Sequence, residues 1–281
     1  MSQCREYLVS AGGYNIAVTE YGNPKGRPVL ALHGWLDNAA SFYALGEFIS
    51  EVRFIAVDLV GHGHSDHRPA EMPYYIWDNV TDLYRLISAL GLEQVDLIGH
   101  SMGASIAMMF AASFPQRVDN LMFIDGLGPL FYEADTLPMD FSDAITKRER
   151  MISRVLKPYG SFDVAVEARA NGRWPVSKTA AEKLMMRGVT HTDKGYIWNN
   201  DPKLLLPSLI RLSPEQIRSF IRKVKSNAIV IIGETGARDS IIDPWLDDLT
   251  DAEVIELEGG HHLHLDLPIA QLLAGKVDRW C

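Results

Sequence analysis

The stretch 95–109, VDLIGHSMGASIAMM, constrains the fold more than any other part of the chain. It begins as an apolar run, reaches Ser101 between Gly99 and Gly103, and continues with small and apolar residues of helical character. This pattern is typical of a buried strand that turns directly into a helix, so tightly that only glycine fits two residues before and two after the serine. The serine then has a strained backbone, with its hydroxyl group above the sheet. We therefore predict that Ser101 is a nucleophile.

Short apolar runs recur along the chain at intervals that suit strand–helix–strand units. Because they lack polar alternation, they indicate parallel strands that are buried on both faces. The predicted strands cover residues 29–33, 54–58, 95–99, 121–125, 229–233 and 254–257. Helical patterns cover residues 39–50, 76–90, 101–113 and 268–280, and residues 14–21 predict a strand of an opening antiparallel ribbon. The predicted fold class is α/β, with a mostly parallel, doubly wound sheet.

The alternation of strands and helices breaks once, between Asp125 and Ala228. About a hundred residues pass there without a convincing strand, which is too long for a loop in a compact domain. Four helices separated by proline and glycine are predicted instead, at residues 143–156, 162–170, 178–187 and 214–223. We predict a helical cap at residues 126–227, inserted into a core formed by residues 1–125 and 228–281.

A base is needed to activate Ser101, because a serine hydroxyl is a weak nucleophile until its proton is removed. The final predicted strand is followed by two glycines and then by His261, His262 and His264. Three histidines in four residues also suit a metal site, but no matching cluster of carboxylates or cysteines supplies the other ligands. We predict no metal and select His261 as the base.

Two backbone amides are candidates for binding the negative charge that develops on a substrate oxygen. Met102 begins the helix behind the serine, where amide groups favour negative charge. Trp35 comes just after a predicted strand and follows Gly34, which lets the backbone approach a substrate closely. The predicted oxyanion hole therefore consists of the N–H groups of Trp35 and Met102.

Composition and charge argue against several other classes of protein. The formal net charge of −9 argues against nucleic acid as a partner. No apolar run approaches the ~20 residues of a membrane span, and the N-terminus lacks a secretory pattern. Cys4 and Cys281 are the only cysteines, which favours free thiols in a reducing compartment. We expect a cytoplasmic protein that is a monomer or a homodimer.

Four motifs, in this order and spacing, resemble those of the α/β-hydrolase superfamily: HGW at 33–35, DLVGHGHS at 58–65, GHSMG at 99–103 and GHHLHLDLP at 260–268. The segments HGWLDNAASF, VDLIGHSMGA and GGHHLHLD are more narrowly similar to the serine-hydrolase-like (kraken-like) branch. The resemblance implies an α/β-hydrolase fold with Ser101 as nucleophile and His261 as general base. It also implies that Trp35 and Met102 form the oxyanion hole.

The acid that completes the triad is the open position. In the family that the chain resembles, the acid usually follows the seventh strand in a G-x-x-D pattern, but residues 233–236 read Gly-Glu-Thr-Gly here. Asp239, three residues later, is the preferred acid. Asp125 is its alternative, because relatives such as haloalkane dehalogenases sometimes place the acid after the sixth strand. Glu234 and Asp243 are further alternatives.

These features indicate a cofactor-independent serine hydrolase. The preferred interpretation is a carboxylic ester hydrolase that acts on small to medium acyl esters through an acyl-enzyme, with a small-molecule ester as its partner. A serine at the elbow speaks against haloalkane dehalogenase or epoxide hydrolase chemistry, which uses aspartate there in related enzymes. A carbon–carbon bond hydrolase or a perhydrolase with the same triad is the enzymatic alternative. The alternative of another class is a non-catalytic ligand-binding module on the same fold.

Overall fold

An eight-stranded sheet lies at the centre of the computed structural model, which describes residues 4–152 and 157–280. In spatial order its strands are β1 (Arg5–Ala11), β2 (Tyr14–Gly22), β4 (Arg53–Val57), β3 (Pro28–Leu32), β5 (Val95–His100), β6 (Val118–Ile124), β9 (Asn227–Thr235) and β10 (Glu253–Gly260). The β1–β2 and β2–β4 pairs are antiparallel, and all neighbours from β4 to β10 are parallel. The chain moves outward from β3 to β4 and then returns to β5 on the other side. The predicted α/β class and doubly wound sheet are confirmed.

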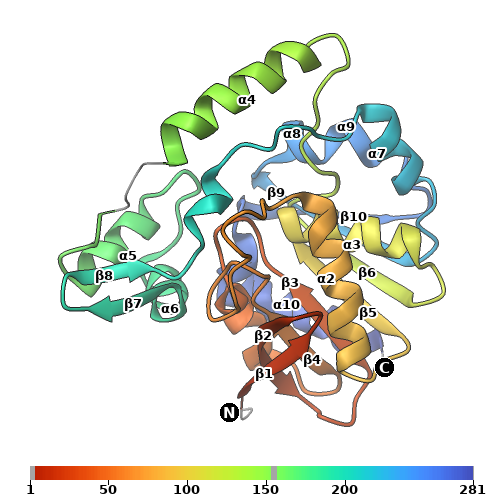
Figure 1. Cartoon of the computed structure of the whole chain (residues 1–281). Helices are drawn as coiled ribbons and strands as arrows, with labels where there is room; N and C mark the ends of the chain where they lie inside the picture. Colours follow the sequence, from red (N-terminus) through yellow and green to blue (C-terminus); the bar gives the residue numbers. More distant parts are fainter. Residues whose placement is uncertain (1–3, 153–156, 281) are drawn as a thin grey trace.

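Helices cover both faces of this sheet (Figure 1). In chain order they are α1 (Tyr43–Phe48), α2 (Ile76–Ala89), α3 (Met102–Ser113), α4 (Leu137–Ile152), α5 (Phe162–Ala170), α6 (Lys178–Gly188), α7 (Pro214–Ile221), α8 (Arg238–Ile241), α9 (Asp243–Leu246) and α10 (Leu267–Val277). Short 3₁₀ turns add η1 (Ala39–Phe42), η2 (Pro202–Leu205), η3 (Leu263–Leu265) and η4 (Asp278–Trp280). None of the described helices combines the length and the apolar character that crossing a membrane requires.

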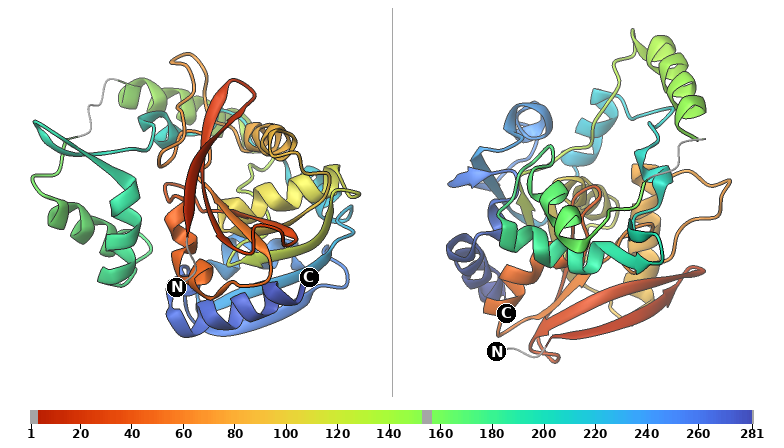
Figure 2. Two further views of the ribbon diagram at one scale, coloured as in Figure 1. Left: turned by 90° about the horizontal axis from the view of Figure 1, so that it is seen from below. Right: turned by 90° about the vertical axis from the view of Figure 1, so that its left-hand side faces the viewer.

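Alternate residues of the parallel strands enter two separate cores, which explains the continuous apolar runs in the sequence. Leu30 and Leu32 of β3 pack in the cluster that also contains buried residues of α2, α3 and α7. Val29 and Ala31 pack in the cluster that contains buried residues of α1 and α10. In Figure 2 (left), α3 and α10 accordingly lie on opposite sides of the sheet. Because side chains of both kinds are buried, polar alternation is absent.

Residues 126–227, the predicted cap, lie between β6 and β9 and hold α4 to α7 (Figure 1). They also form a hairpin of β7 (Val189–Thr192) and β8 (Gly195–Trp198) that the sequence analysis did not predict. A turn at residues 193–194 joins the two strands, and Gly195, whose φ is 113°, begins the second one. The helix predicted at 143–156 begins earlier, at Leu137, because Pro138 fits a first helical turn. Its predicted end lies outside the described residues.

The last helix of this segment packs differently from the others. Ile217 and Ile221 of α7 are fully buried in the cluster that contains the α3 side chains. By its packing α7 therefore belongs with the core. The division at residues 126–227 stays a prediction about domain organisation. Below, "cap" is only a name for the part of this segment before α7, and "core" is a name for the rest.

Candidate active site

Ser101 stands at the junction of β5 and α3 in a strained conformation, with φ 52° and ψ −115°. The two glycines around it are required by close backbone approaches. A Cβ atom on Gly103 would collide with the Leu32 carbonyl oxygen, and one on Gly99 would collide with the backbone of Ala104. The apolar strand, the two glycines and the helix therefore form the tight turn that the sequence predicts.

A chain of hydrogen bonds links three side chains from three strand ends. Ser101 Oγ donates to Nε2 of His261 at 3.0 Å, and His261 Nδ1 donates to Oδ2 of Asp125 at 2.6 Å. Asp125 is fully buried, and His261 is 5% exposed. Because a carboxylate only accepts hydrogen bonds, the Asp125 contact keeps the proton on Nδ1 and leaves Nε2 free to accept the serine proton.

Asp125, and not Asp239, lies against His261. The Asp125 carboxylate also accepts hydrogen bonds from the backbone N–H groups of Gly233, at 3.0 Å, and Ala237, at 2.8 Å. Asp239 is exposed on α8 and has no contact with the histidine among the described residues. The prediction that Asp239 lies beside the base is therefore wrong. The physical reason lies at Gly236, which stands where the usual G-x-x-D pattern has its acid. A Cβ there would collide with the Asp125 carboxylate, which already fills that space.

Comparisons with known proteins identify the family of this fold. The family model for the alpha/beta hydrolase fold matches residues 27–169. The chain belongs to the α/β-hydrolase family. A serine hydrolase-like protein of Danio rerio is 30% identical over 264 residues, which cover 89% of this chain and 80% of that protein. Serine hydrolase-like protein 2 of Homo sapiens is 30% identical, over 90% of this chain and 87% of the relative.

These relatives place this α/β-hydrolase in the serine-hydrolase-like branch and support a hydrolase on this fold. Among solved structures, a hypothetical protein of Pseudomonas aeruginosa PAO1 aligns with a TM-score of 0.92 and 37% identity, over 98% of each chain. A thioesterase domain from the curacin biosynthetic pathway aligns with a TM-score of 0.82 and 22% identity, over 98% of this chain and 99% of that one. At that identity the second likeness shows the shared fold.

Three further histidines of this α/β-hydrolase are buried and hydrogen-bonded near the site. His100, next to Ser101 in sequence, donates from Nε2 to the His261 carbonyl oxygen at 2.8 Å. His264 Nε2 pairs with Ser41 Oγ at 2.9 Å, and His33 Nε2 accepts the Leu59 N–H at 3.0 Å. Burial holds the pKa of His100 well below its usual range and lowers that of His264 to about 3. These rings are therefore neutral hydrogen-bonding groups.

A buried charged cluster lies beside the triad and joins core to cap. Asp37 Oδ1 accepts from Nη2 of Arg169 in α5 at 2.9 Å, and Asp37 Oδ2 accepts from His262 Nε2 at 2.9 Å. Burial alone raises the pKa of Asp37, but His262 and Arg169 together hold it well below its usual range. Asp37 is therefore an anion that is fixed between two donors. Nothing in the sequence pattern pointed to this cluster.

The same region holds the set of side chains that comes closest to a metal site in the described part of the chain. Ligand atoms of Asp37, His100 and His262 lie within 4.8 Å of one another. However, the Arg169 guanidinium contacts Asp37 at 2.9 Å and lies 3.1 Å from His262 Nε2. A fixed positive charge on two of the three ligands opposes a metal cation, and both Asp37 oxygens are already used. These residues do not fit a metal ion.

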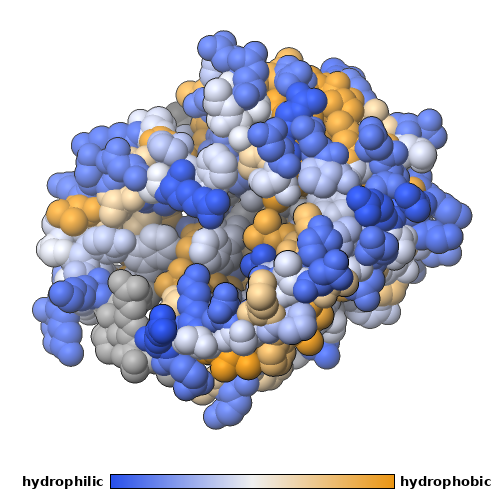
Figure 3. Space-filling view, turned by 90° about the horizontal axis from the view of Figure 1, so that it is seen from above, coloured by the Kyte–Doolittle hydropathy of each residue, from blue (hydrophilic) through white to orange (hydrophobic). Residues whose placement is uncertain are grey.

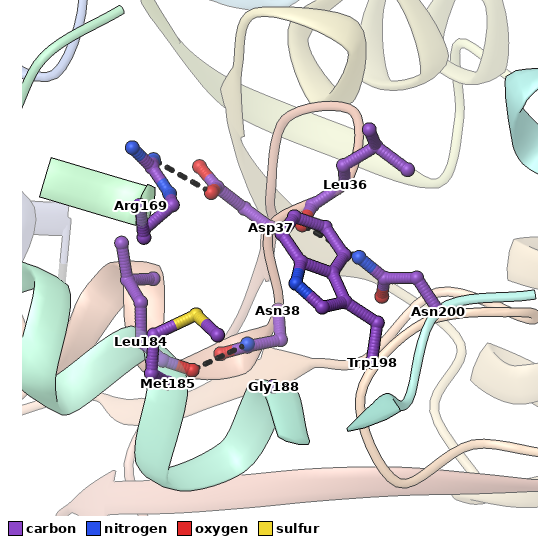
Figure 4. Close-up of a pocket in the computed structure, with 9 residues that line it drawn as sticks. All are labelled: Leu36, Asp37, Asn38, Arg169, Leu184, Met185, Gly188, Trp198 and Asn200. Atoms are coloured by element: carbon purple, nitrogen blue, oxygen red, sulfur yellow. Dashed lines mark hydrogen bonds and ion pairs between the residues drawn. The ribbon is translucent and has the colours of Figure 1, made fainter. Parts of the chain in front are cut away.

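The core loop 36–38 is held by several elements of the cap (Figure 4). Besides the Arg169–Asp37 pair, Asn38 Nδ2 donates to the Leu184 carbonyl of α6 at 3.0 Å. Asn200 Nδ2, after β8, donates to the Leu36 carbonyl at 2.8 Å. The contacts between cap and core at this loop are thus mainly polar and directional.

The two predicted oxyanion donors lie at the nucleophile. Met102 is the first residue of α3, directly after Ser101. The loop that carries Trp35 approaches the serine closely, since a Cβ on Gly34 would come 3.3 Å from the Ser101 Cβ. Among the described residues, neither the Trp35 nor the Met102 amide N–H has a hydrogen-bond acceptor. Seen from above, the surface is hollowed near its middle, with hydrophobic and hydrophilic residues around the hollow (Figure 3).

Proposed function

We propose that this α/β-hydrolase is a cofactor-independent serine hydrolase that cleaves carboxylic esters of small to medium acyl chain length. The observation that carries the proposal is the unbroken chain of hydrogen bonds from Ser101 through His261 to Asp125. Each group has the neighbour that its role requires: a nucleophile beside a base, and a base held by a buried carboxylate.

The proposed reaction has two steps. In the first, Ser101 Oγ bonds to the ester carbonyl carbon while His261 Nε2 takes its proton, and Asp125 stabilises the imidazolium. The imidazolium then gives the proton to the alcohol oxygen as the carbon–oxygen bond breaks, which leaves an acyl group on Ser101. In the second step, water attacks this acyl group, His261 takes the water proton and returns it to Ser101, and the carboxylic acid leaves.

The N–H groups of Trp35 and Met102 are the proposed donors to the tetrahedral oxyanion. Their lack of acceptors in the described residues supports this role, as do the position of Met102 directly after the serine and the close approach of Gly34 to it. The N-terminus of α3 adds a partial positive charge to the same region. Such fixed donors stabilise charge where it develops in the transition state, which is often the largest single contribution to rate.

Replacement of the nucleophile tests the proposal. Ester turnover by Ser101→Ala should fall on the order of 10⁴-fold or more, because the covalent path is lost while the oxyanion donors remain. The measurement is turnover of p-nitrophenyl esters of rising acyl length, with labelling by a fluorophosphonate probe. Only enzymes with Ser101 should be labelled.

Ser105→Ala, one turn further along α3, is the matched control and should keep both turnover and labelling. Undiminished labelling of Ser101→Ala would refute the assignment of the nucleophile. A wild-type protein with neither turnover nor labelling would instead favour a ligand-binding module on this fold.

A further inference from the structure

One cap side chain contacts the ring of His261. The indole of Trp174 lies with its ring centre 4.6 Å from that of the imidazole, at an angle of 37° between the planes. The core supplies the His100 ring, whose centre is 4.8 Å from that of His261. The imidazole therefore has a core ring and a cap ring as neighbours. Its two nitrogens are free to meet Ser101 and Asp125.

We propose that Trp174 is a positioning residue that keeps the His261 imidazole in line between Ser101 and Asp125 and stabilises its protonated form. This inference rests on the proposed function, because protonation of His261 occurs in that reaction. An indole face attracts a cation more strongly than any other aromatic side chain does. A ring held at contact distance also prevents the imidazole from turning away from the serine.

The other described groups around His261 are not suited to stabilise its protonated form through a π face. Asp125 carries the negative charge, and the Ser101 hydroxyl group forms a hydrogen bond with His261 Nε2. Burial holds the pKa of His100 well below its usual range, and burial also lowers the pKa of His262, so neither ring shares the positive charge. In the described part of the chain, Trp174 is therefore the one aromatic ring against His261 that is not itself a titratable imidazole.

Arg169, whose side chain is 11% exposed, holds Trp174 in place. Arg169 Nη1 donates to the Trp174 carbonyl oxygen at 3.2 Å, while Nη2 of the same guanidinium donates to Asp37 at 2.9 Å. The planar guanidinium thus ties the cap backbone at Trp174 to a buried anion of the core. The Val176 N–H, which donates to the Ala170 carbonyl at 3.1 Å, fixes the segment on its other side.

Trp174 is not part of a packed apolar core. It is half-buried, and the residues after it line a hollow of about 190 Å³ together with the core loop that carries His262. Its neighbour Arg173 is exposed, with its guanidinium carbon 5.8 Å from the indole ring centre. The contact with His261 is therefore made by a cap segment that polar bonds hold in position.

Paired substitutions of Trp174 test the inference. Trp174→Leu keeps an apolar cover but removes the π face, whereas Trp174→Phe keeps both. With p-nitrophenyl acetate as substrate, kcat of Trp174→Leu should fall about tenfold while KM stays near the wild-type value, since the lost contact acts on the transition state. Trp174→Phe should restore most of kcat. Equal kcat in the two variants, or a change in KM alone, would overturn the proposal.

A second readout does not depend on turnover. The proton on His261 Nδ1, bonded to Asp125, should give a low-field ¹H NMR resonance that is absent from His261→Gln. It should remain sharp in Trp174→Phe and broaden in Trp174→Leu as the imidazole loses its fixed position. If the wild-type protein has no esterase activity, this resonance still tests the positioning role by itself. An equally sharp resonance in Trp174→Leu would refute it.

Two arginine variants test how Trp174 is held. Arg169→Lys keeps a charge beside Asp37, but one ammonium group does not reproduce the planar fork that reaches both Asp37 and the Trp174 carbonyl. It should therefore lower kcat in the same direction as Trp174→Leu. Arg173→Ala, on the exposed neighbour, is the matched control and should leave kcat unchanged. Wild-type kcat in Arg169→Lys would show that Trp174 needs no such anchor.

Discussion

In this α/β-hydrolase, the interior of the core and the interior of the cap are stabilised by different interactions. In the core, two large apolar clusters fill the space between the sheet and its helices, and side chains such as Phe54, Phe110 and Phe123 are fully buried. In the cap, the apolar clusters are small, and α4 leaves Phe141 and Ile145 exposed at 38% and 41%. Close packing of large side chains therefore stabilises the core far more than the cap.

The contacts between the two regions are apolar where Ala180 and Leu184 of α6 pack against Leu265, and polar at loop 36–38. Loop 36–38 accepts from Arg169 and Asn200 and donates to the Leu184 carbonyl. The Trp35 indole donates to the Leu204 carbonyl at 3.1 Å. Ser101, Asp125 and His261 all follow strands of the core sheet. We therefore expect the core to fix the geometry of the proposed reaction. The cap is expected to modify that geometry through a few directional contacts.

The largest predicted effect lies in the core and compares two carboxylates. Asp125→Asn should lower kcat by up to ~10⁴-fold, because an amide no longer fixes the proton on His261 Nδ1 or stabilises the imidazolium. Asp239→Asn should leave kcat near the wild-type value, since Asp239 is exposed on α8. Steady-state kinetics of both purified variants decide between them, with circular dichroism to check folding. A larger loss in Asp239→Asn would contradict the geometry.

The structure brings Ser101 and His261 into contact, as local sequence pattern led us to expect. A strand, two glycines and a helix specify the elbow, and a histidine after the last strand can reach it. The acid was misplaced because the choice depends on the space between two strand ends. The signal was present in Gly236: the usual acid position holds a residue without a side chain, since the carboxylate of Asp125 occupies that volume.

The cap was harder to predict for a physical reason. Its helices α4 to α6 carry helical patterns that the sequence analysis found, but its short hairpin and its polar contacts give little periodic signal. The β7–β8 hairpin has only four residues in each strand, and its turn lacks a two-residue Asn-Gly signal. The Asp37–Arg169–His262 cluster joins residues that are far apart in the chain, and its polar contacts have no sequence period at all.

The next prediction applies one substitution to both regions. Phe123→Ala removes a fully buried ring from β6 and should lower the free energy of unfolding by about 3–5 kcal/mol, through lost transfer energy and the cavity left behind. Phe141→Ala on α4, where the ring is 38% exposed, should change it by no more than about 0.5 kcal/mol. Urea unfolding of both variants gives the comparison. Equal losses would mean that the cap is packed as tightly as the core.

The smallest predicted effect compares a buried core histidine with an exposed cap histidine. Burial lowers the pKa of His264 to about 3, whereas an unfolded chain has a histidine pKa near 6.5. Between these values the unfolded state binds one more proton, so the stabilising contribution is complete above about pH 6.5 and is lost as the pH falls. The slope for this one proton is about 1.4 kcal/mol per pH unit.

His264→Gln should reduce the pH dependence of the free energy of unfolding by that amount, and the contribution of the other buried histidines should remain. His191→Gln, on exposed β7, should leave the slope unchanged. Urea unfolding between about pH 7 and about pH 5 measures all three proteins, and identical slopes in wild type and His264→Gln would show that His264 becomes protonated without loss of the fold.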